Sequence, residues 1–597
     1  MIHKILKKTF GYDYFRPYQE HIIQRILKSQ DSIVIMPTGG GKSICYQVPA
    51  IAMDGCAIII TPLISLMQDQ VMSLQQLGVN ARLWNSTSSY KDVQMITKEL
   101  HNKTLKCLYI SPERLAMDSF VERLRPDMLS FFAIDEAHCI SEWGHDFRPK
   151  YRELKLLKAT FKNKPIMALT ASATPKVIAD IQAQLQLDTA EIFQASFNRK
   201  NLYYNVKKKK NTFKQCLKFI NQRLDQSGIM YCQSRKTVTT VTEKLNRQGI
   251  KALPYHAGLS SDQREKTQKA FIHDEVPIIV ATIAFGMGIN KPNVRYVIHY
   301  DLPKSIENFY QETGRAGRDG LESECVLFFS YADRHKYEYF IREIDSEVER
   351  EQAYKKLYLM MDFAAKPRCR RVQLMAYFGE VMDEKECQYC DICKNPPQQI
   401  DITVVAQKIL SCIYRVNQRF GISMIVDILK GNATDKIKMY RFDQLSTFNI
   451  VDDFNKSELH DVVSHLIYCR KINIEGDQYP ILKLASSAIP ILHGKETITM
   501  PIYKQEKGGR RQPKMDKEYT HDEWLYGQLK QKRKEMSKQM NVPAYVILHD
   551  KTLKEIAAKK PQTLQALLDI SGIGQTKVDR YGDIFLSIVK QTAPTVV

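Results

Sequence analysis

The chain has 597 residues, a length typical of about four domains, and a net charge of +21. An apolar fraction of 44% with 26% charged residues is typical of a globular protein, and the sequence contains no run of 18 apolar residues that would span a membrane. The charge favours a polyanionic partner. We expect nucleic acid rather than a membrane surface, because no basic amphipathic anchor is present, and a cytosolic protein, because the N-terminus lacks a signal-peptide core.

Aromatic and amide side chains gather near the N-terminus in Phe10-Gly-Tyr-Asp-Tyr-Phe-Arg-Pro-Tyr-Gln19. A glutamine amide can both donate to and accept from an adenine edge, and an aromatic ring can stack on the base. The alternative is an aromatic-rich helix start that packs into the core. The position just before the next motif favours an element that recognises a nucleotide.

That motif is a glycine-rich loop, Met36-Pro-Thr-Gly-Gly-Gly-Lys-Ser43, between an apolar run and a helical pattern. Such loops surround phosphate with backbone N–H groups, while a lysine reaches the β- and γ-phosphates and a hydroxyl binds Mg²⁺. Met36 stands where the strict P-loop pattern has its first glycine, so a glycine-rich turn with a surface lysine is the alternative. The residues expected to contact ATP are Thr38, Gly39, Gly40, Gly41, Lys42 and Ser43.

Apolar runs then alternate with helical patterns, which predicts a parallel sheet with helices on both faces; the runs are residues 57–61, 107–111, 131–134 and 165–169. Ligands of such sheets bind at the carboxyl ends of the strands. The third run ends in Asp135 and Glu136, which suit Mg²⁺ binding and polarisation of the attacking water, respectively. An acid pair alone would more often be a solvated turn. Its presence in one sheet with a phosphate loop favours the catalytic role.

Four motifs occur in an order that resembles superfamily 2 helicases: the loop, the Asp135-Glu-Ala-His138 box, Ala171-Ser-Ala-Thr174 and Gln311-Glu-Thr-Gly-Arg-Ala-Gly-Arg-Asp-Gly320. The stretch from Asp135 to Pro149 resembles the RecQ family in particular. There an aromatic-rich loop couples binding of single-stranded DNA to ATP hydrolysis. Aromatic rings stack on bases without reading sequence, and arginine adds phosphate contact. The matching residues are Trp143, His145, Phe147 and Arg148. The alternative is that Trp143 is an ordinary core residue.

The same resemblance implies that Tyr12, Arg16 and Gln19 form the adenine-binding element, with Tyr12 stacking on the base and Gln19 reading its edge. It also explains why Met36 can replace the first glycine of the P-loop pattern, because the loops of superfamily 2 helicases accept other residues at that position.

A second alternating unit, residues 201–345, lacks a phosphate loop of its own. It carries Arg315 and Arg318, and an arginine from a facing domain can neutralise charge on the γ-phosphoryl group. Such a residue is called an arginine finger. Resemblance to the sixth motif of the family assigns this role to Arg318, supported by Arg315 and Gln311. The alternative is a surface ion-pair cluster. ATP between the two units would draw them together, and hydrolysis would let them part and move a bound strand.

Four cysteines follow: Cys369, Cys387, Cys390 and Cys393. Four soft thiolates suit a closed tetrahedral zinc site, with an iron–sulfur cluster as the rival. The cysteines follow the helicase core directly, and in this the segment resembles the RecQ zinc-binding subdomain. That resemblance favours structural zinc.

Helical patterns and then two strand-like runs between residues 471 and 484 predict a winged helix, in the place of the RecQ C-terminal domain that grips duplex DNA. Tyr479 is either a wing-tip DNA contact or a simple strand aromatic. The polar segment 504–518 is expected to be a basic linker. The last segment resembles the HRDC domain, in which Tyr545 could stack on a base, or simply pack in an apolar run, and the turn Gly572-Ile-Gly574 could bind phosphate.

The predicted fold is therefore α/β with two RecA-like parallel-sheet domains (1–200 and 201–345). A helical zinc-binding subdomain (346–397), a winged helix (398–503) and, after the linker, an all-α HRDC domain (519–597) follow. The resemblance implies an ATP-dependent DNA helicase that moves 3′ to 5′ in recombination and repair, with ATP, Mg²⁺ and Zn²⁺ as cofactors. Its expected partners are single-stranded and duplex DNA and a single-strand DNA-binding protein, and we expect a monomer. The alternatives are an RNA helicase, a duplex translocase that does not unwind, and a non-catalytic nucleic-acid scaffold.

Overall fold

The structure is a computed structural model of the full chain. It describes all residues except 86–87, 116–117, 122, 143–146, 287–288, 290, 384–385, 476–479, 503–521, 541 and 592–597. The predicted linker, 504–518, lies outside the described residues. The chain divides into two compact units, one of residues 1–328, 370–390 and 512–597, and one of residues 329–369 and 391–511. No helix in the described part of the chain combines the length and the apolar character that crossing a bilayer requires.

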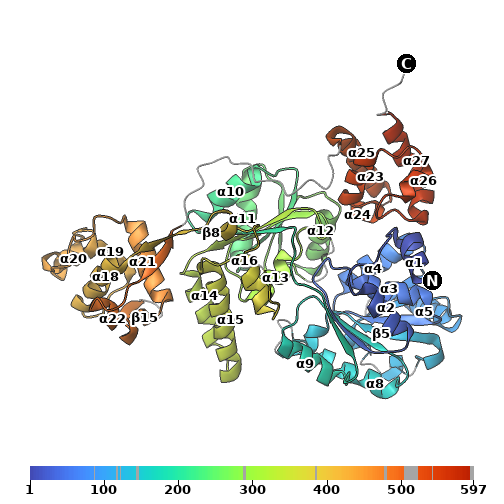
Figure 1. Ribbon diagram of the computed structural model, residues 1–597, viewed down its shortest axis with the longest axis horizontal. Coiled ribbons are helices and arrows are strands. Elements are labelled where there is room, and N and C mark those ends of the chain that lie inside the picture. The colour runs from blue at the N-terminus through green and yellow to red at the C-terminus, as the bar shows by residue number, and fades with distance from the viewer. Residues whose placement is uncertain are drawn as a thin grey trace. The chain divides into compact units, whose positions relative to one another are not determined.

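The first unit begins with a seven-stranded sheet in the order β3-β4-β2-β5-β6-β1-β7, whose paired strands are all parallel (Figure 1). Its central strands are buried on both faces, as continuous apolar runs require. The strands are β1 (Ser32–Ile35), β2 (Cys56–Ile60), β3 (Ala81–Trp84), β4 (Cys107–Ile110), β5 (Leu129–Ile134), β6 (Ile166–Thr170) and β7 (Glu191–Gln194).

Helices connect these strands. They are α1 (Ile2–Ile5), α2 (Gln19–Leu27), α3 (Lys42–Ala52), α4 (Ile64–Gln76), α5 (Tyr90–His101), α6 (Pro112–Leu115), α7 (Asp118–Val121), α8 (Leu156–Thr160) and α9 (Pro175–Gln184), with a π-helical turn, η1, at Leu6–Phe10.

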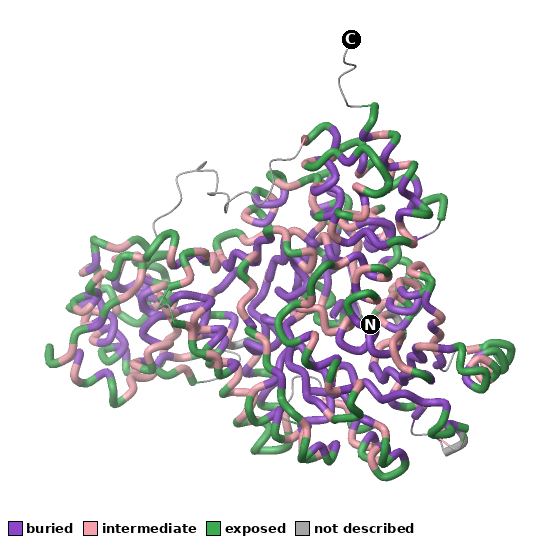
Figure 2. The backbone as a smooth tube through the Cα atoms, turned by 45° about the vertical axis from the view of Figure 1, so that its right-hand side comes forward, coloured by how far each residue is buried: buried purple, intermediate pink, exposed green. Residues whose placement is uncertain are grey.

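A six-stranded sheet follows in the order β10-β11-β9-β12-β13-β8. Its strands are β8 (Leu202–Lys208), β9 (Ser227–Tyr231), β10 (Ala252–Tyr255), β11 (Ile278–Ala281), β12 (Val294–His299) and β13 (Ser323–Phe329). The helices are α10 (Thr212–Asn221), α11 (Arg235–Arg247), α12 (Ser261–Ile272), α13 (Ile306–Thr313) and α16 (Arg370–Tyr377). The central strands of both sheets are buried, whereas β7 at the edge of the first sheet is largely exposed. Figure 2 shows the buried residues gathered in the interior of the fold, as expected for sheets covered by helices.

The last part of the first unit is a helical domain, which we call the HRDC domain: α23 (Glu523–Met540), α24 (Ala544–Ile547), α25 (Asp550–Lys559), α26 (Leu564–Leu568) and α27 (Gln575–Gln591). Apolar side chains from these helices form one core. A buried ion pair crosses it, with the Arg533 guanidinium 2.6 Å from the Asp550 carboxylate. Burial would raise the pKa of Asp550, but Arg533 holds it at about 2, so the carboxylate stays charged.

The second unit holds two helices, α14 (Asp333–Arg342) and α15 (Glu347–Ala365), and the short α17 (Asp391–Lys394). The predicted winged helix follows with its own apolar core. Its elements are β14 (Gln398–Asp401), α18 (Thr403–Arg415), α19 (Ile422–Leu429), α20 (Asp435–Met439), α21 (Lys456–Tyr468), β15 (Ile472–Glu475), β16 (Ile481–Leu484), α22 (Ile489–Leu492) and β17 (Thr499–Ile502). β15 and β16 form the predicted antiparallel hairpin, and β14 pairs with β17.

Candidate nucleotide and metal sites

The glycine-rich loop connects β1 to α3 at the carboxyl edge of the first sheet. The Met36 N–H donates to the Thr170 carbonyl (3.0 Å), which ties the loop to the end of β6, and the Gly40 N–H donates to Pro37 (2.8 Å). Gly39 and Gly41 have φ values of +81° and +93°, which side chains other than glycine rarely adopt. The first turn of α3 begins at Lys42, so its N-terminal amides lie beside the loop.

The predicted adenine element packs directly on this loop. The Gln19 side-chain amide donates to the Gly41 carbonyl (3.0 Å) and accepts from the Arg16 N–H (2.8 Å). The Arg16 guanidinium donates to the Gly39 carbonyl (2.5 Å). Tyr12 is partly buried, and burial raises the pKa of its phenol. Arg16 and Gln19 therefore hold the backbone of the loop, and contact of Tyr12, Arg16 and Gln19 with a base stays a prediction.

The acid pair stands at the end of β5 in the same sheet. Asp135 is buried, and its carboxylate accepts the Glu136 N–H (3.0 Å). Burial and the neighbouring Glu136 raise the pKa of Asp135, while the Lys42 ammonium opposes them. Lys42 itself donates to the Met36 carbonyl (3.3 Å). Ser43 lies one residue further along α3, which follows β1, and only β6 separates β1 from β5 in the sheet. The hydroxyl and the carboxylate predicted to bind Mg²⁺ therefore lie at the same edge.

His138 belongs to the Asp135–His138 box, but the sequence analysis assigned it no role of its own. It is fully buried, with Nδ1 3.3 Å from the Glu136 carboxylate and 2.9 Å from the Thr170 hydroxyl. Thr170 in turn donates to the Ser172 carbonyl (3.2 Å). Burial lowers the pKa of His138 to about 3, so the ring is neutral. The imidazole thus connects the acid pair to the predicted Ala171–Thr174 motif.

The second sheet supplies the arginine segment. Gln311 lies in α13, and Arg315 and Arg318 follow in the turn after it. The loop backbone runs close to this turn, because a side chain built on Gly39 would meet the Arg318 Cα at 3.4 Å. Burial lowers the pKa of Arg318 to about 9, with Arg315 and Arg199 adding to the effect, so the guanidinium stays charged at neutral pH.

Arg199, which no sequence motif marked, joins the two halves. Its Nη1 donates to the Thr38 carbonyl of the loop (2.5 Å), and its Nη2 donates to Ala316 (3.0 Å) and Gly317 (2.8 Å) in the arginine segment. The residue lies between the last strand of the first sheet and β8 of the second. One guanidinium therefore contacts both parts of the predicted ATP site.

The aromatic-rich segment is described only at its end. Trp143 and His145 lie outside the described residues. Phe147 is partly buried, and the Arg152 guanidinium lies 4.9 Å from its ring centroid. The Arg148 backbone N–H donates to Cys139 (2.8 Å), and its guanidinium donates to the Pro62 carbonyl (3.3 Å). The described end of the segment is thus joined to Cys139 and Pro62, and its contact with DNA stays a prediction.

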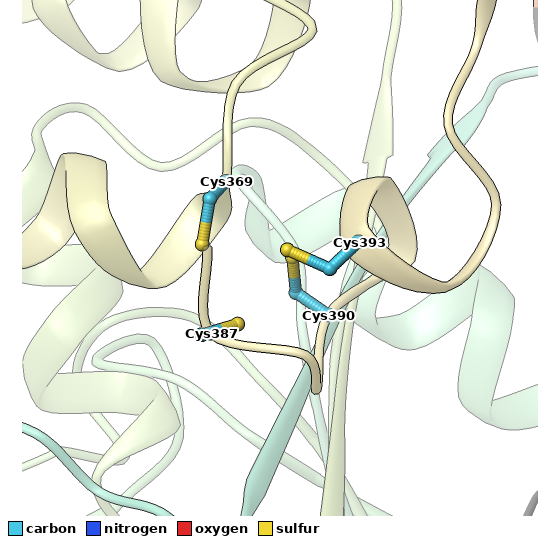
Figure 3. Close-up of side chains that lie close together, drawn as sticks. All are labelled: Cys369, Cys387, Cys390 and Cys393. Atoms are coloured by element: carbon cyan, nitrogen blue, oxygen red, sulfur yellow. The ribbon is translucent and has the colours of Figure 1, made fainter. Parts of the chain in front are cut away.

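The four predicted metal-binding cysteines come together. Figure 3 shows the sulfurs of Cys369, Cys387, Cys390 and Cys393 converging, and they all lie within 4.8 Å of one another. Four thiolates bound to one zinc ion at about 2.3 Å stand about 3.8 Å apart, so the set fits. A four-iron cluster separates its thiolates more widely, since each binds a different iron. Two of the four are buried and two are half-buried.

Three further predictions of DNA contact concern Tyr479, Tyr545 and the Gly572–Gly574 turn. Tyr479 lies outside the described residues. Tyr545 is buried, at 8% exposure, with its ring 6.3 Å from the His549 ring. The Gly572 N–H, expected to face phosphate, donates to the Gly11 carbonyl (2.9 Å).

Comparison with known proteins adds family matches along the whole chain. Family models match in this order: DEAD/DEAH box helicase (16–181), helicase conserved C-terminal domain (208–320), RecQ zinc-binding (331–394), RQC domain (396–508) and HRDC domain (522–589). The zinc-binding match covers the four cysteines, which makes the cluster a zinc site.

Curated relatives match over nearly the full length. The ATP-dependent DNA helicase RecQ of Pasteurella multocida is 42% identical over 98% of this chain and 93% of its own length. The proteins of the same name from Haemophilus influenzae and Bacillus subtilis are 40% and 38% identical, covering 98% and 99% of this chain and 95% and 99% of their own lengths. The chain belongs to the RecQ family of DNA helicases.

Proposed function

We propose that the chain is an ATP-dependent DNA helicase whose ATP site is divided between the two sheets, and that it moves 3′ to 5′ along single-stranded DNA in recombination and repair. The observation that carries the proposal is the Arg199 bridge, since one side chain contacts the phosphate loop and the arginine segment together. A change in the loop on nucleotide binding or release is thereby passed to the second sheet.

We assign the chemistry to groups of the loop, the acid pair and the arginine segment. The loop amides and Lys42 bind the phosphates, Glu136 orients the attacking water, and Arg318 neutralises charge that develops on the γ-phosphoryl group. Ser43 and Asp135 would hold Mg²⁺, which would supply further charge neutralisation. Arg315 and Gln311 position the finger. The neutral His138 holds Glu136 in place from behind.

Movement along the DNA strand follows from closure and release of the two sheets. The predicted DNA contacts follow the acid pair closely in the chain; they are Trp143, His145, Phe147 and Arg148. ATP hydrolysis and the binding of the DNA strand would therefore change together. The net charge of +21 suits a protein that tracks a phosphate backbone. We place the protein in the cytoplasm at the nucleoid because its substrate is there. A monomer that contacts a single-strand DNA-binding protein is the expected form.

Steady-state ATP hydrolysis with single-stranded DNA, RNA or no nucleic acid tests the proposal. We expect strong stimulation by DNA, weak stimulation by RNA, and no stimulated activity in Lys42→Ala. A clear preference for RNA would support an RNA helicase instead. Equal rates for wild type and Lys42→Ala would support the non-catalytic scaffold, and DNA-stimulated hydrolysis without strand separation would support the non-unwinding translocase.

A further inference from the structure

The short segment between the two sheets, residues 195–201, is tied down at both of its ends, and we call it the inter-sheet linker. The Ala195 N–H donates to the carbonyl of the last residue of β1 (2.8 Å). At the other end the Asn201 side-chain amide donates to the Gly317 carbonyl in the arginine segment (2.9 Å). Arg199, which bridges the two halves of the predicted ATP site, lies between these attachments. Its position therefore depends on how the linker is held.

The carboxylate of Glu380, in the turn that follows α16, binds the middle of the linker. One of its oxygens accepts the Phe197 N–H (2.7 Å), and the other accepts the Ser196 hydroxyl (2.5 Å). The Ser196 oxygen in turn accepts the Asn198 N–H (3.1 Å). Hydrogen bonds to a carboxylate are about twice as strong as those between neutral groups. This one side chain therefore fixes the three residues that come just before Arg199.

An aromatic cluster supports the same point of the linker. Phe197 is fully buried, and its ring stacks on that of Phe378 with 4.7 Å between the centroids. The hydroxyl of Tyr310, in α13, donates to the Phe197 carbonyl (2.9 Å), and the Tyr310 ring lies 4.8 Å from the Phe378 ring. Since α13 leads directly into the arginine segment, these contacts join the linker to the turn after α16 and to the helix before the predicted finger.

Arg371, in α16, holds the other side of the linker. Its Nη2 donates to the carbonyls of Lys200 (3.3 Å) and Leu202 (2.9 Å). The helix and the turn after it therefore contact the backbone on both sides of Arg199. Arg371 is buried, whereas Glu380 is only half-buried and can be replaced with less disturbance of the core.

We propose that Glu380 is a positioning residue of ATP hydrolysis, which fixes the inter-sheet linker so that Arg199 reaches the Thr38 carbonyl and the arginine segment together. The inference rests on the proposed ATP site. Glu380 acts through Arg199, because its own two oxygens are bound by linker groups. A long arginine side chain has many rotamers, and a fixed backbone restricts it to those from which its planar fork spans both groups. A misplacement of about 1 Å in such a group can cost up to about a hundredfold in rate.

Substitutions at position 380 test the proposal in the full chain. Glu380→Ala removes both acceptor oxygens, whereas Glu380→Gln keeps an oxygen of the same reach for the Phe197 N–H. Glu380→Asp keeps the charge on a side chain one methylene shorter, and it is the milder variant should Glu380→Ala not fold. Asp383→Ala is the matched control, because it removes an exposed carboxylate from the same segment. The measurements are kcat/KM for ATP with saturating single-stranded DNA, Tm and zinc content.

We expect kcat/KM to fall about threefold to tenfold in Glu380→Ala and by a smaller factor in Glu380→Asp. Glu380→Gln and Asp383→Ala should stay within about twofold of the wild type, because each leaves the Phe197 N–H with an acceptor. Zinc content should be the same in all four variants, since the cysteines are unchanged. A fall in Tm with unchanged kcat/KM would overturn the positioning role, because it would leave Glu380 a structural role alone.

The same substitution in an Arg199→Ala chain tests whether Glu380 acts through Arg199. There Glu380→Ala should cost less than about twofold, because the side chain that it positions is gone. An equal loss in both backgrounds would overturn the action through Arg199. Lys42→Ala tests the ATP site separately: wild-type hydrolysis in this variant would contradict the site itself. An inactive Lys42→Ala beside a fully active Glu380→Ala would overturn the positioning role alone.

Discussion

The ATP site and the cysteine cluster both gather residues from distant positions in the sequence, but they depend on their ligands in different ways. The ATP-site residues stand on the edges of two buried sheets, which hold them whether or not a nucleotide is bound. The cysteines stand on short elements, with Cys393 in the one-turn helix α17 and Cys369 just before α16. One turn of helix is not stable alone. Removing a side chain should therefore cost chemistry at the first site and folding at the second.

Cys390→Ser should have the largest effect, and the effect should be on folding. Loss of one thiolate from a structural zinc site removes on the order of 10 kcal/mol of local folding free energy. We expect zinc loss and rapid proteolysis between residues 366 and 397. Cys216→Ser, which alters a buried thiol of α10 in the core beside the second sheet, is the control and should keep its zinc. Full zinc retention in Cys390→Ser would contradict the four-thiolate site.

Arg318→Ala should show the opposite behaviour. Removing an arginine finger lowers kcat by about 10³–10⁵ in comparable enzymes, and the sheet that carries it should stay folded. DNA-stimulated ATP hydrolysis measures the rate, and thermal unfolding checks the fold. Arg247→Ala, at an exposed position of α11, is the control. A fall in Tm comparable to that of a core substitution would show that Arg318 serves the fold instead.

Arg199→Ala should have an intermediate effect. It removes the contacts that join Thr38 to the arginine segment, each of which contributes about 0.5–1.5 kcal/mol net. We expect kcat/KM for ATP to fall about tenfold to a hundredfold, with Arg199→Lys no better, because a single ammonium cannot span the same carbonyls. Full activity in Arg199→Lys would show that charge alone suffices.

Trp143→Ala should have the smallest effect on the ATP site itself. Base stacking contributes about 1–3 kcal/mol per base, so the DNA concentration for half-maximal ATPase should rise about fivefold or more. Nucleotide affinity should stay near the wild-type value. If DNA stimulation were unchanged, the aromatic segment would not couple the two activities.

The sequence predicted those parts of the molecule that local pattern determines. Apolar runs located the central strands, and the motifs found the strand ends because ligand-binding edges carry polar residues after buried strands. Edge strands were missed: β7 is largely exposed and mixed in polarity, and β10 contains a proline. The four cysteines were found from spacing and family resemblance, since few other arrangements use thiolates in that pattern.

Residues whose importance lies in distant contacts could not be found in this way. Arg199 reads as an ordinary basic residue between two elements, and only the fold brings Thr38 and Gly317 to its guanidinium. His138 gains its role from Thr170, 32 residues away. Burial of Tyr545, by contrast, was one of the two alternatives that its apolar run indicated.

A double-mutant cycle tests the divided ATP site most directly. DNA-stimulated kcat would be measured for the wild type, Lys42→Ala, Arg318→Ala and the double variant. Residues that act as one catalytic unit are strongly non-additive, so we expect the double variant to be no slower than the slower single variant. Losses that multiply fully would contradict it, because they would show that Lys42 and Arg318 do not act on one bound nucleotide.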